Sequence, residues 1–311
     1  MAGSRRGGLD DRRQTRVNGR IGHGMDRIIS RRACGRRRIG RIIRFTLHRR
    51  IDKLRTNSMK LPFLIFVAGS LFAQLPNDAL LPDIQEQIPN HLQIQNEQKK
   101  EMLRFTTGHV NLGKGPLQIR GGNQIAPCVV SGVPFAECTH ATQEILDANG
   151  SVVATHLAGV AVFHPEHNHW HQGDVALFAI RAGSLNGPLV GTGTKVTFCL
   201  VDTERVDSVK TTKTRTYWDC NAALQGISPG WVDTYHHSTP GQELEITGAP
   251  EGIYYLTHLA NPEKNWLESN YNNNSAWVKF KLVRQGANPK VEILETSPCV
   301  AGLTCPSPAN P

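Results

Sequence analysis

Three features are missing from this 311-residue sequence, and each absence excludes a class of protein. The longest apolar run, from Leu61 to Ala73, is well short of the roughly 20 residues that a membrane-spanning helix needs, so we expect no membrane span. An apolar repeat of 3.6 residues never extends beyond two turns, which argues against a helical bundle. Because no C-x-x-C pair is present, the usual knuckle of a structural zinc site is missing too.

Acidic residues are scarce in the first 58 residues, which hold 18 of the 35 lysines and arginines but only four of the 26 aspartates and glutamates. The rest of the chain has a net charge of −5, although the whole chain stands at +9. A basic nucleic-acid-binding globule is therefore excluded for the bulk of the chain, and we expect no nucleic-acid partner there.

A signal-peptide pattern begins at Met59, where one lysine precedes the apolar run and small and polar residues follow it. We expect residues 59–73 to be a signal peptide and the protein to be secreted or periplasmic. Residues 1–58 then form a basic, arginine-rich segment that we interpret as lying upstream of the true start. Two alternatives stay open for it: a basic arm that binds nucleic acid, and a twin-arginine export signal that uses Arg49 and Arg50.

Six cysteines follow the predicted signal peptide, and an even number in an exported chain favours disulfides over buried free thiols. We expect neighbours in the sequence to pair, which gives Cys128 with Cys138, Cys199 with Cys220, and Cys299 with Cys305.

Short strand-like runs between Gly, Pro and Asn turns predict a mainly β protein, an antiparallel β-sandwich-like single domain with long loops. The predicted strands are Met102–Phe105, Leu117–Arg120, Gln143–Asp147, Val152–His156, Val175–Ile180, Lys195–Val201, Glu243–Ile246, Ile253–Leu259 and Ala276–Val283. Between two of them, Asp147–Ser151 predicts a hairpin, because Asn149 and Gly150 tolerate a positive φ.

Residues 74–100 are polar and contain prolines, so we expect them to lead into the domain and not to form a core element. We place the domain at 101–285 and a C-terminal tail with a cysteine pair at 286–311.

The most informative stretch is FHPEHNHWHQ at residues 163–172. In an extended strand the side chains of His167, His169 and His171 point to one face, with α-carbons about 6.5–7 Å apart at each step. Three imidazoles can therefore converge on one metal ion. Three such ligands leave positions open for water, oxygen or substrate, as a catalytic site needs, and they serve zinc and copper alike.

The neighbouring histidines have weaker signals. His164 precedes His167 by an odd number of residues, so in an extended strand its side chain would point to the opposite face. This suggests that it lies behind the ligands or acts as a fourth, weaker ligand. His236 and His237 follow Tyr235 and could lie near the site, although a polar loop is the default for them. A solvent-facing or packing role for the alternating histidines is the structural alternative to a metal site.

Four motifs in order, from about Leu80 to Leu282, resemble the catalytic domain of the lysyl oxidases: HPEHNHWH at 164–171, KVTFCLVDT at 195–203, QGISPGWVDTY at 225–235 and ESNYNNN at 268–274. The resemblance implies that His167, His169 and His171 bind copper(II). It also implies a lysine tyrosylquinone cofactor built from Lys195 and Tyr235. The implied reaction is the oxidative deamination of a primary amine by molecular oxygen, with release of an aldehyde, ammonia and hydrogen peroxide.

The resemblance also suggests secondary roles. Asp233, two residues before Tyr235, is a candidate acid/base residue, with a turn-capping aspartate as the alternative. Residues Glu268, Asn270, Asn273 and Asn274 resemble the calcium-binding segment of the family, although position 270 carries Asn where an acidic residue is expected.

We therefore expect a secreted copper amine oxidase that acts on peptidyl lysine or another primary amine. Two rival functions stay open. One is a non-enzymatic exported metal-binding β-sandwich module. The other is a zinc hydrolase that uses the same histidines, for which the sequence offers no obvious general base. Several cysteines of the family are absent, including the one expected where Trp231 stands, so we expect the disulfide framework to be reduced or different.

Overall fold

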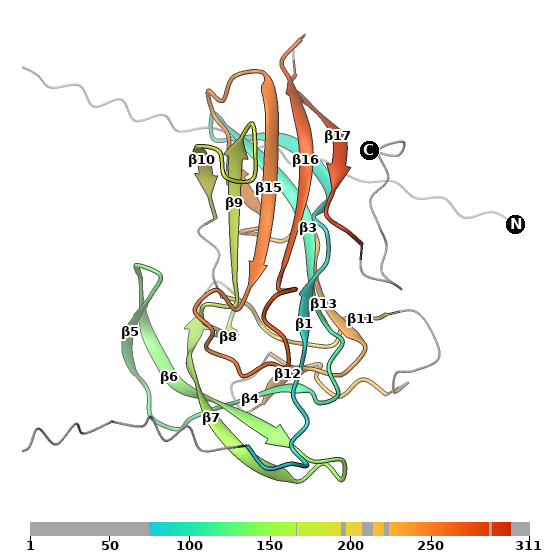
Figure 1. Cartoon of the computed structure of the whole chain (residues 1–311). Helices are drawn as coiled ribbons and strands as arrows, with labels where there is room; N and C mark the ends of the chain where they lie inside the picture. Colours follow the sequence, from blue (N-terminus) through green and yellow to red (C-terminus); the bar gives the residue numbers. More distant parts are fainter. Residues whose placement is uncertain are drawn as a thin grey trace, which may run out of the picture. The chain divides into compact units, whose positions relative to one another are not determined.

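The computed structural model describes residues 75–165, 167–193, 197–206, 214–220, 224–285 and 288–299, which belong to one compact unit. The described residues form 17 β-strands in three antiparallel sheets and contain no helix, so the prediction of a mainly β protein is confirmed (Figure 1). Within this described part, no helix meets the length and apolarity needed to cross a membrane. The predicted signal peptide, the segment 1–58 and Cys305 lie outside the described residues.

The first sheet is organised around one long strand, β3 (Lys100–Asn111). Its neighbours are β1 (Ile84–Glu86), β2 (Asn90–Glu97), β13 (Trp231–Tyr235) and β14 (Glu243–Glu245), with β11 (Glu204–Arg205) paired to β13. Nearly all of β3 is buried from Leu103 onward, as expected for a strand covered on both faces. This strand therefore sets the register of the sheet that carries Tyr235.

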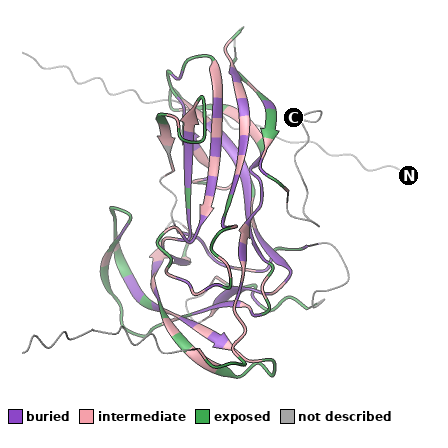
Figure 2. Cartoon of the chain, viewed as in Figure 1, coloured by how far each residue is buried: buried purple, intermediate pink, exposed green. Residues whose placement is uncertain are grey.

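The second sheet has the order β10 (Leu189–Thr192), β9 (Ala176–Ala182), β15 (Gly252–Ala260), β16 (Ser275–Val283) and β17 (Lys290–Thr296). Buried and half-buried residues alternate along β15 and β16, the pattern of strands with one face on a core (Figure 2). That core is shared with the first sheet, since Phe105 of β3 packs edge-on against Phe178 of β9 with ring centroids 5.1 Å apart. The two sheets thus form a sandwich.

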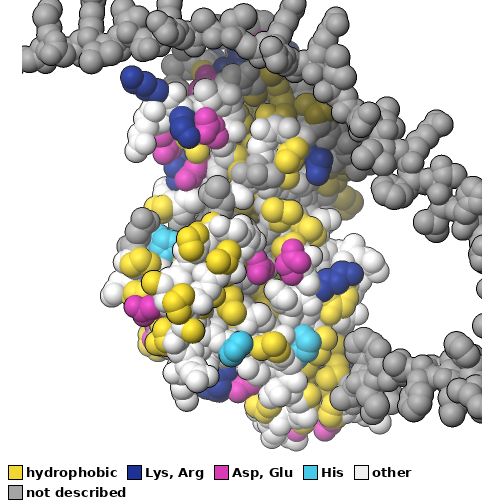
Figure 3. Space-filling model, turned by 90° about the vertical axis from the view of Figure 1, so that its left-hand side faces the viewer, with side chains coloured by type: hydrophobic (Ala, Val, Ile, Leu, Met, Phe, Trp, Pro, Cys, Tyr) yellow, Lys and Arg dark blue, Asp and Glu magenta, His cyan; other side chains and the backbone are white. Residues whose placement is uncertain are grey.

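The third sheet contains β12 (Gln225–Ile227), β4 (Leu117–Gly121), β6 (Val133–Leu146), β7 (Val152–His164) and β8 (His169–Gln172), with β5 (Ala126–Val130) paired to β6. The predicted hairpin joins β6 to β7, with Gly150 at φ +81°. Exposed apolar side chains are common on β5–β7, and hydrophobic side chains are numerous on the face drawn in Figure 3. They include Val129, Val133, Val152 and Leu157, and Ile125 is exposed just before β5.

Eight of the nine predicted strands are confirmed, and the ninth is wrong where it is described. Residues 197–201 form no strand, and Phe198 makes only an isolated bridge with Gln172. Lys195 and Val196 lie outside the described residues. Residues 197–201 instead form part of a cavity wall, where their backbone and side-chain polar groups hydrogen-bond to β8 and β13.

Two predictions about the ends of the domain are also wrong. Residues 74–100 do contribute to the core, because β1 and β2 lie there and Ile84 and Ile88 are buried. The predicted tail contains β17, which pairs with β16 and extends the second sheet beyond residue 285. Both segments are polar on one face only, a pattern that short edge strands share with loops.

Two of the three predicted disulfides are confirmed, Cys128–Cys138 and Cys199–Cys220. Cys299 is disulfide-bonded as well. Its predicted partner, Cys305, is not among the described residues.

Candidate active site

A cavity of about 470 Å³ collects most of the candidate residues. Its wall combines imidazoles, a carboxylate and a phenol with threonine hydroxyls and small apolar groups. Its lining includes His167, His169, His171, Cys199, Val201, Cys220, Asp233, Tyr235, Thr239 and Pro240. The predicted metal ligands and the predicted cofactor tyrosine, which are 64 residues apart between His171 and Tyr235, are therefore brought to one place.

The three histidines converge as expected. His167 Nδ1 lies 3.4 Å from His171 Nε2, and His169 Nε2 lies 2.9 Å from the same atom. Two imidazole nitrogens bound to one ion at 2.0–2.1 Å would be roughly 2.9 Å apart at a right angle and roughly 3.4 Å apart at a tetrahedral angle. The observed spacing fits a shared metal ion, and imidazole suits copper and zinc.

The route to this convergence differs from the prediction of one extended strand. Only His169 and His171 belong to β8, and His167 lies in the turn that precedes it. Asn168 has φ +54°, a left-handed conformation that Asn adopts more readily than most residues. The turn therefore aims His167 at the same point as the strand histidines. His164, at the end of β7, stacks on His167 with ring centroids 4.3 Å apart.

The segment 197–200 connects the histidines to the tyrosine. Thr197 Oγ1 lies 3.2 Å from His171 Nδ1, the nitrogen away from the converging atoms, and so fixes that ring. Phe198 exchanges two backbone hydrogen bonds with Gln172 of β8, and the carbonyl of Cys199 accepts a hydrogen bond of 2.6 Å from the Tyr235 hydroxyl. Lys195 stands two residues before Thr197 in the sequence and lies outside the described residues.

Asp233 and Tyr235 come from β13, which pairs with β3 so that Asp233 faces His109 and Tyr235 faces Thr107. Asp233 is almost completely buried, and Tyr235 is half-buried with its ring edge-on to Phe198. Burial and the nearby Asp233 carboxylate raise the pKa of Tyr235 well above its usual value of 10. The phenol is therefore held neutral at the cavity wall.

Comparison with known proteins agrees with this arrangement. A model of the lysyl oxidase family matches residues 137–291, which include the three histidines, Asp233 and Tyr235. The chain belongs to the lysyl oxidase family. Lysyl oxidase homolog 3A of Danio rerio is 36% identical over 114 residues, and lysyl oxidase homolog 2 of Gallus gallus is 36% identical over 113 residues. Lysyl oxidase homolog 2 of Homo sapiens is 34% identical over 113 residues.

These matches cover 36–37% of the chain but only 14–15% of the length of each relative. The shared part is therefore a lysyl oxidase domain, while the relatives are much longer proteins. Membership of the lysyl oxidase family supports a lysyl-oxidase-like amine oxidase. The roles of individual residues stay predictions.

The segment that resembles the calcium site of the lysyl oxidase family is only partly assembled as expected. Glu268 is buried, and its carboxylate accepts hydrogen bonds from the side-chain amides of Asn274 and Asn261 and from the Ile84 amide. Burial raises the pKa of Glu268. The side-chain amides of Asn261 and Asn274 therefore fix the Glu268 carboxylate.

The other two residues of that segment have separate partners. Asn273 Nδ2 donates to Asp83 Oδ1, at 2.8 Å, while Asn270 Oδ1 accepts from Asn272 N within its own turn. Asp83, which the sequence reading missed, places a carboxylate beside the segment in which Asn270 departs from the family pattern. The carboxylates of Asp83 and Glu268 and the buried side-chain oxygens of Asn273 and Asn274 therefore lie near one another, and calcium binding by this segment stays a prediction.

A second buried cluster was also missed. Glu86, His109 and His258 are fully buried, with His109 Nδ1 2.8 Å and His258 Nδ1 2.7 Å from the two oxygens of Glu86. The His109 ring lies 6.5 Å from the Tyr235 ring, so this charged cluster stands directly behind the tyrosine. Its members come from β1, β3 and β15, and no local spacing could have revealed them.

Proposed function

We propose that this protein is an exported copper-dependent amine oxidase that converts primary amines, with peptidyl lysine as the substrate class, into aldehydes. Each turnover would consume the amine, one molecule of oxygen and one of water, and would release the aldehyde, ammonia and hydrogen peroxide. The observation that carries the proposal is the single cavity that holds three converging imidazoles and a half-buried tyrosine at its wall.

A copper ion and a quinone cofactor in this cavity would provide the redox chemistry. His167, His169 and His171 would hold copper(II), and Tyr235 with Lys195 would provide the lysine tyrosylquinone. When bound, they supply electron transfer from the amine to oxygen. The position of Thr197, in contact with His171 and two residues after Lys195, supports the lysine as a partner for this site.

The remaining residues would bind and orient the amine. Asp233 provides a buried carboxylate beside Tyr235, which suits attraction of the ammonium group and acceptance of a proton from the carbon next to nitrogen. Val201 and Pro240 offer apolar surface for a methylene chain such as that of lysine. The hydrogen bond from Tyr235 to the Cys199 carbonyl orients the ring before the cofactor forms.

The decisive experiment combines peptide mapping with an activity assay. The full chain is produced with copper in air, peptides are mapped by mass spectrometry for a covalent link between Lys195 and Tyr235, and peroxide release is measured with a blocked lysyl peptide and a small alkylamine. Tyr235→Phe should abolish both the link and turnover. The matched control is Tyr255→Phe, because Tyr255 is another half-buried tyrosine, on β15. This variant should retain both the covalent link and turnover.

Turnover that survives in Tyr235→Phe would overturn the quinone proposal. If copper binds stoichiometrically while both residues stay unmodified, the exported metal-binding module becomes the better description.

A further inference from the structure

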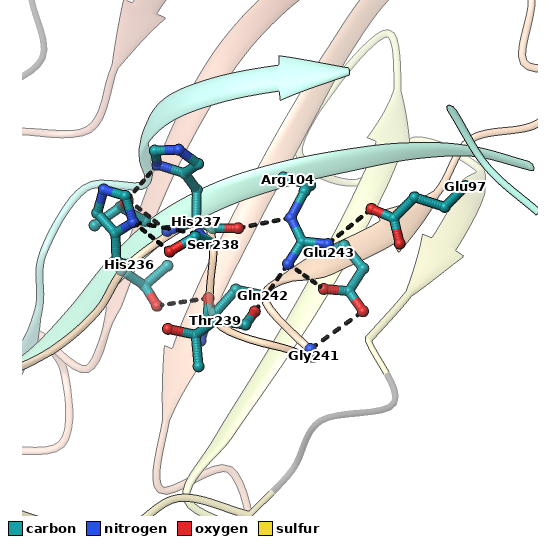
Figure 4. Close-up of polar contacts among 11 residues, drawn as sticks. Glu97, Arg104, His236, His237, Ser238, Thr239, Gly241, Gln242 and Glu243 are labelled. Carbon is teal, nitrogen blue, oxygen red and sulfur yellow. Dashed lines mark hydrogen bonds and ion pairs between the residues drawn. The ribbon is translucent and has the colours of Figure 1, made fainter. Parts of the chain in front are cut away.

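A second group of histidines lies outside the catalytic cavity, and we call it the surface histidine cluster: His91, His236 and His237. One ring nitrogen from each lies within 4.8 Å of the other two. His236 and His237 directly follow Tyr235 of β13, whereas His91 belongs to β2. Two of the rings are exposed and the third is half-buried, so an ion has access from solvent. Figure 4 shows the loop of His236 and His237 together with its polar contacts.

The backbone at His91 is unusual for a strand. His91 has φ +51°, and the pairing of β2 with β3 shifts register between Asn90 and Gln93. A bulge of this kind re-aims a side chain, and a left-handed conformation in a non-glycine residue persists only where its surroundings hold it. Here the result is that the His91 ring faces His236 and His237, at centroid distances of 6.0 and 5.8 Å.

Each ring of the surface histidine cluster is held by a hydroxyl group at Nδ1. Thr106 Oγ1 lies 3.3 Å from Nδ1 of His91 and 3.4 Å from Nδ1 of His237. Ser238 Oγ lies 2.9 Å from Nδ1 of His236. Such contacts at one ring nitrogen orient an imidazole, as is found behind metal-binding histidines, and Nδ1 of His236 also accepts a hydrogen bond from the backbone amide of Ser238, at 3.3 Å.

The loop that carries two of the rings is fixed by Arg104. Its guanidinium donates to the carbonyl of His237, at 2.6 Å, and to the carbonyl of Thr239, at 3.0 Å. Glu97 and Glu243 pair with the same guanidinium and balance its charge, so a cation can approach the cluster (Figure 4).

We propose that the surface histidine cluster binds a divalent transition-metal ion of the zinc or copper type, at a site separate from the three histidines of the catalytic cavity. Three imidazoles from two elements, pre-oriented by hydroxyl groups, match the preference of these ions for nitrogen ligands. The site would clamp the loop after Tyr235 onto β2. Pro240 lines both the catalytic cavity and the neighbouring pocket beside Arg104, so the clamp would hold one wall of the cavity.

The test measures zinc bound per chain after equilibrium dialysis, using zinc alone so that oxidase maturation plays no part. Full-length protein carrying His169→Ala provides a background in which the catalytic set is broken but the surface histidine cluster is intact. Adding His91→Ala to this background should remove about one zinc ion per chain. Adding His140→Ala, an exposed histidine outside the three-residue clusters, is the matched control and should remove none.

Equal zinc content in the His91→Ala and His140→Ala proteins would overturn the proposal. A second variant, His236→Ala, should also lose one zinc ion. Zinc should raise the melting temperature of the background protein, and this rise should disappear in both the His91→Ala and the His236→Ala proteins. Retention of that rise in His236→Ala would equally refute the site. Because zinc is measured in an oxidase-deficient background, failure here leaves the proposed amine oxidation untouched.

Discussion

Removal of the Cys199–Cys220 disulfide should affect stability and catalysis by separate routes. The bridge closes a loop with a sequence separation of 21 residues, and the chain-entropy relation gives a stabilisation of about 3.3 kcal/mol for that length. Both cysteines also line the cavity that holds the three converging histidines and Tyr235. The Cys199 carbonyl accepts a hydrogen bond from the Tyr235 hydroxyl. The Cys220 carbonyl accepts one from the backbone amide of Trp170, which lies between His169 and His171.

The Cys128–Cys138 bridge is the matched control, because it joins β5 to β6 and closes a loop with a separation of 10 residues, for which the same relation gives about 2.7 kcal/mol. Denaturant unfolding of the two double-alanine variants should therefore show similar losses of stability. Peroxide release per folded molecule should fall by about 100-fold only in Cys199→Ala/Cys220→Ala, since a shift of roughly 1 Å in the reacting groups has that effect. Equal activity in the two variants would refute the positioning role of the bridge.

Three further predictions concern single residues. Lys195→Arg should abolish amine oxidation while leaving copper content nearly unchanged, because guanidinium cannot add to the tyrosine ring; retained peroxide release would remove the quinone. Burial lowers the pKa of His258 below 6.5 despite the attraction of Glu86, so the unfolded chain binds that proton more readily and the free energy of unfolding should fall as pH decreases below about 6.5. Urea unfolding from about pH 8 to about pH 5 measures this, and a flat profile contradicts it. Trp266 is fully buried, and Trp266→Ala should lower the free energy of unfolding by about 3–5 kcal/mol; a loss below about 1 kcal/mol would show that its pocket collapses.

Local patterns in the sequence predict the parts of this protein that depend on near neighbours. The alternation of His167, His169 and His171 indicates a convergent site, because three like ligands within five residues need only a strand or a tight turn to meet. The turn at Asn149 and Gly150 is predictable because these two residue types tolerate a positive φ. Disulfides between near cysteines follow for the same reason.

Contacts between distant segments are not predictable in this way. Glu86, His109 and His258 meet only because β1, β3 and β15 pack together, and each residue alone looks like an ordinary polar strand position. The strand β13 has five residues and no long apolar alternation, so the sequence offers Tyr235 as a site residue only through the family resemblance. His91 faces the loop of His236 and His237 because of a bulge in β2, and no residue type in the sequence predicts that bulge.

The pairing of β13 with β3 has a consequence for how this chain can vary in length. Side chains alternate along a strand, so the insertion of one residue into β13 would turn Asp233 and Tyr235 to the opposite face of the sheet. Insertions and deletions should therefore be absent from this strand in related sequences. The exposed turn at Asn149 and Gly150 connects only β6 to β7, and length differences among relatives should accumulate there.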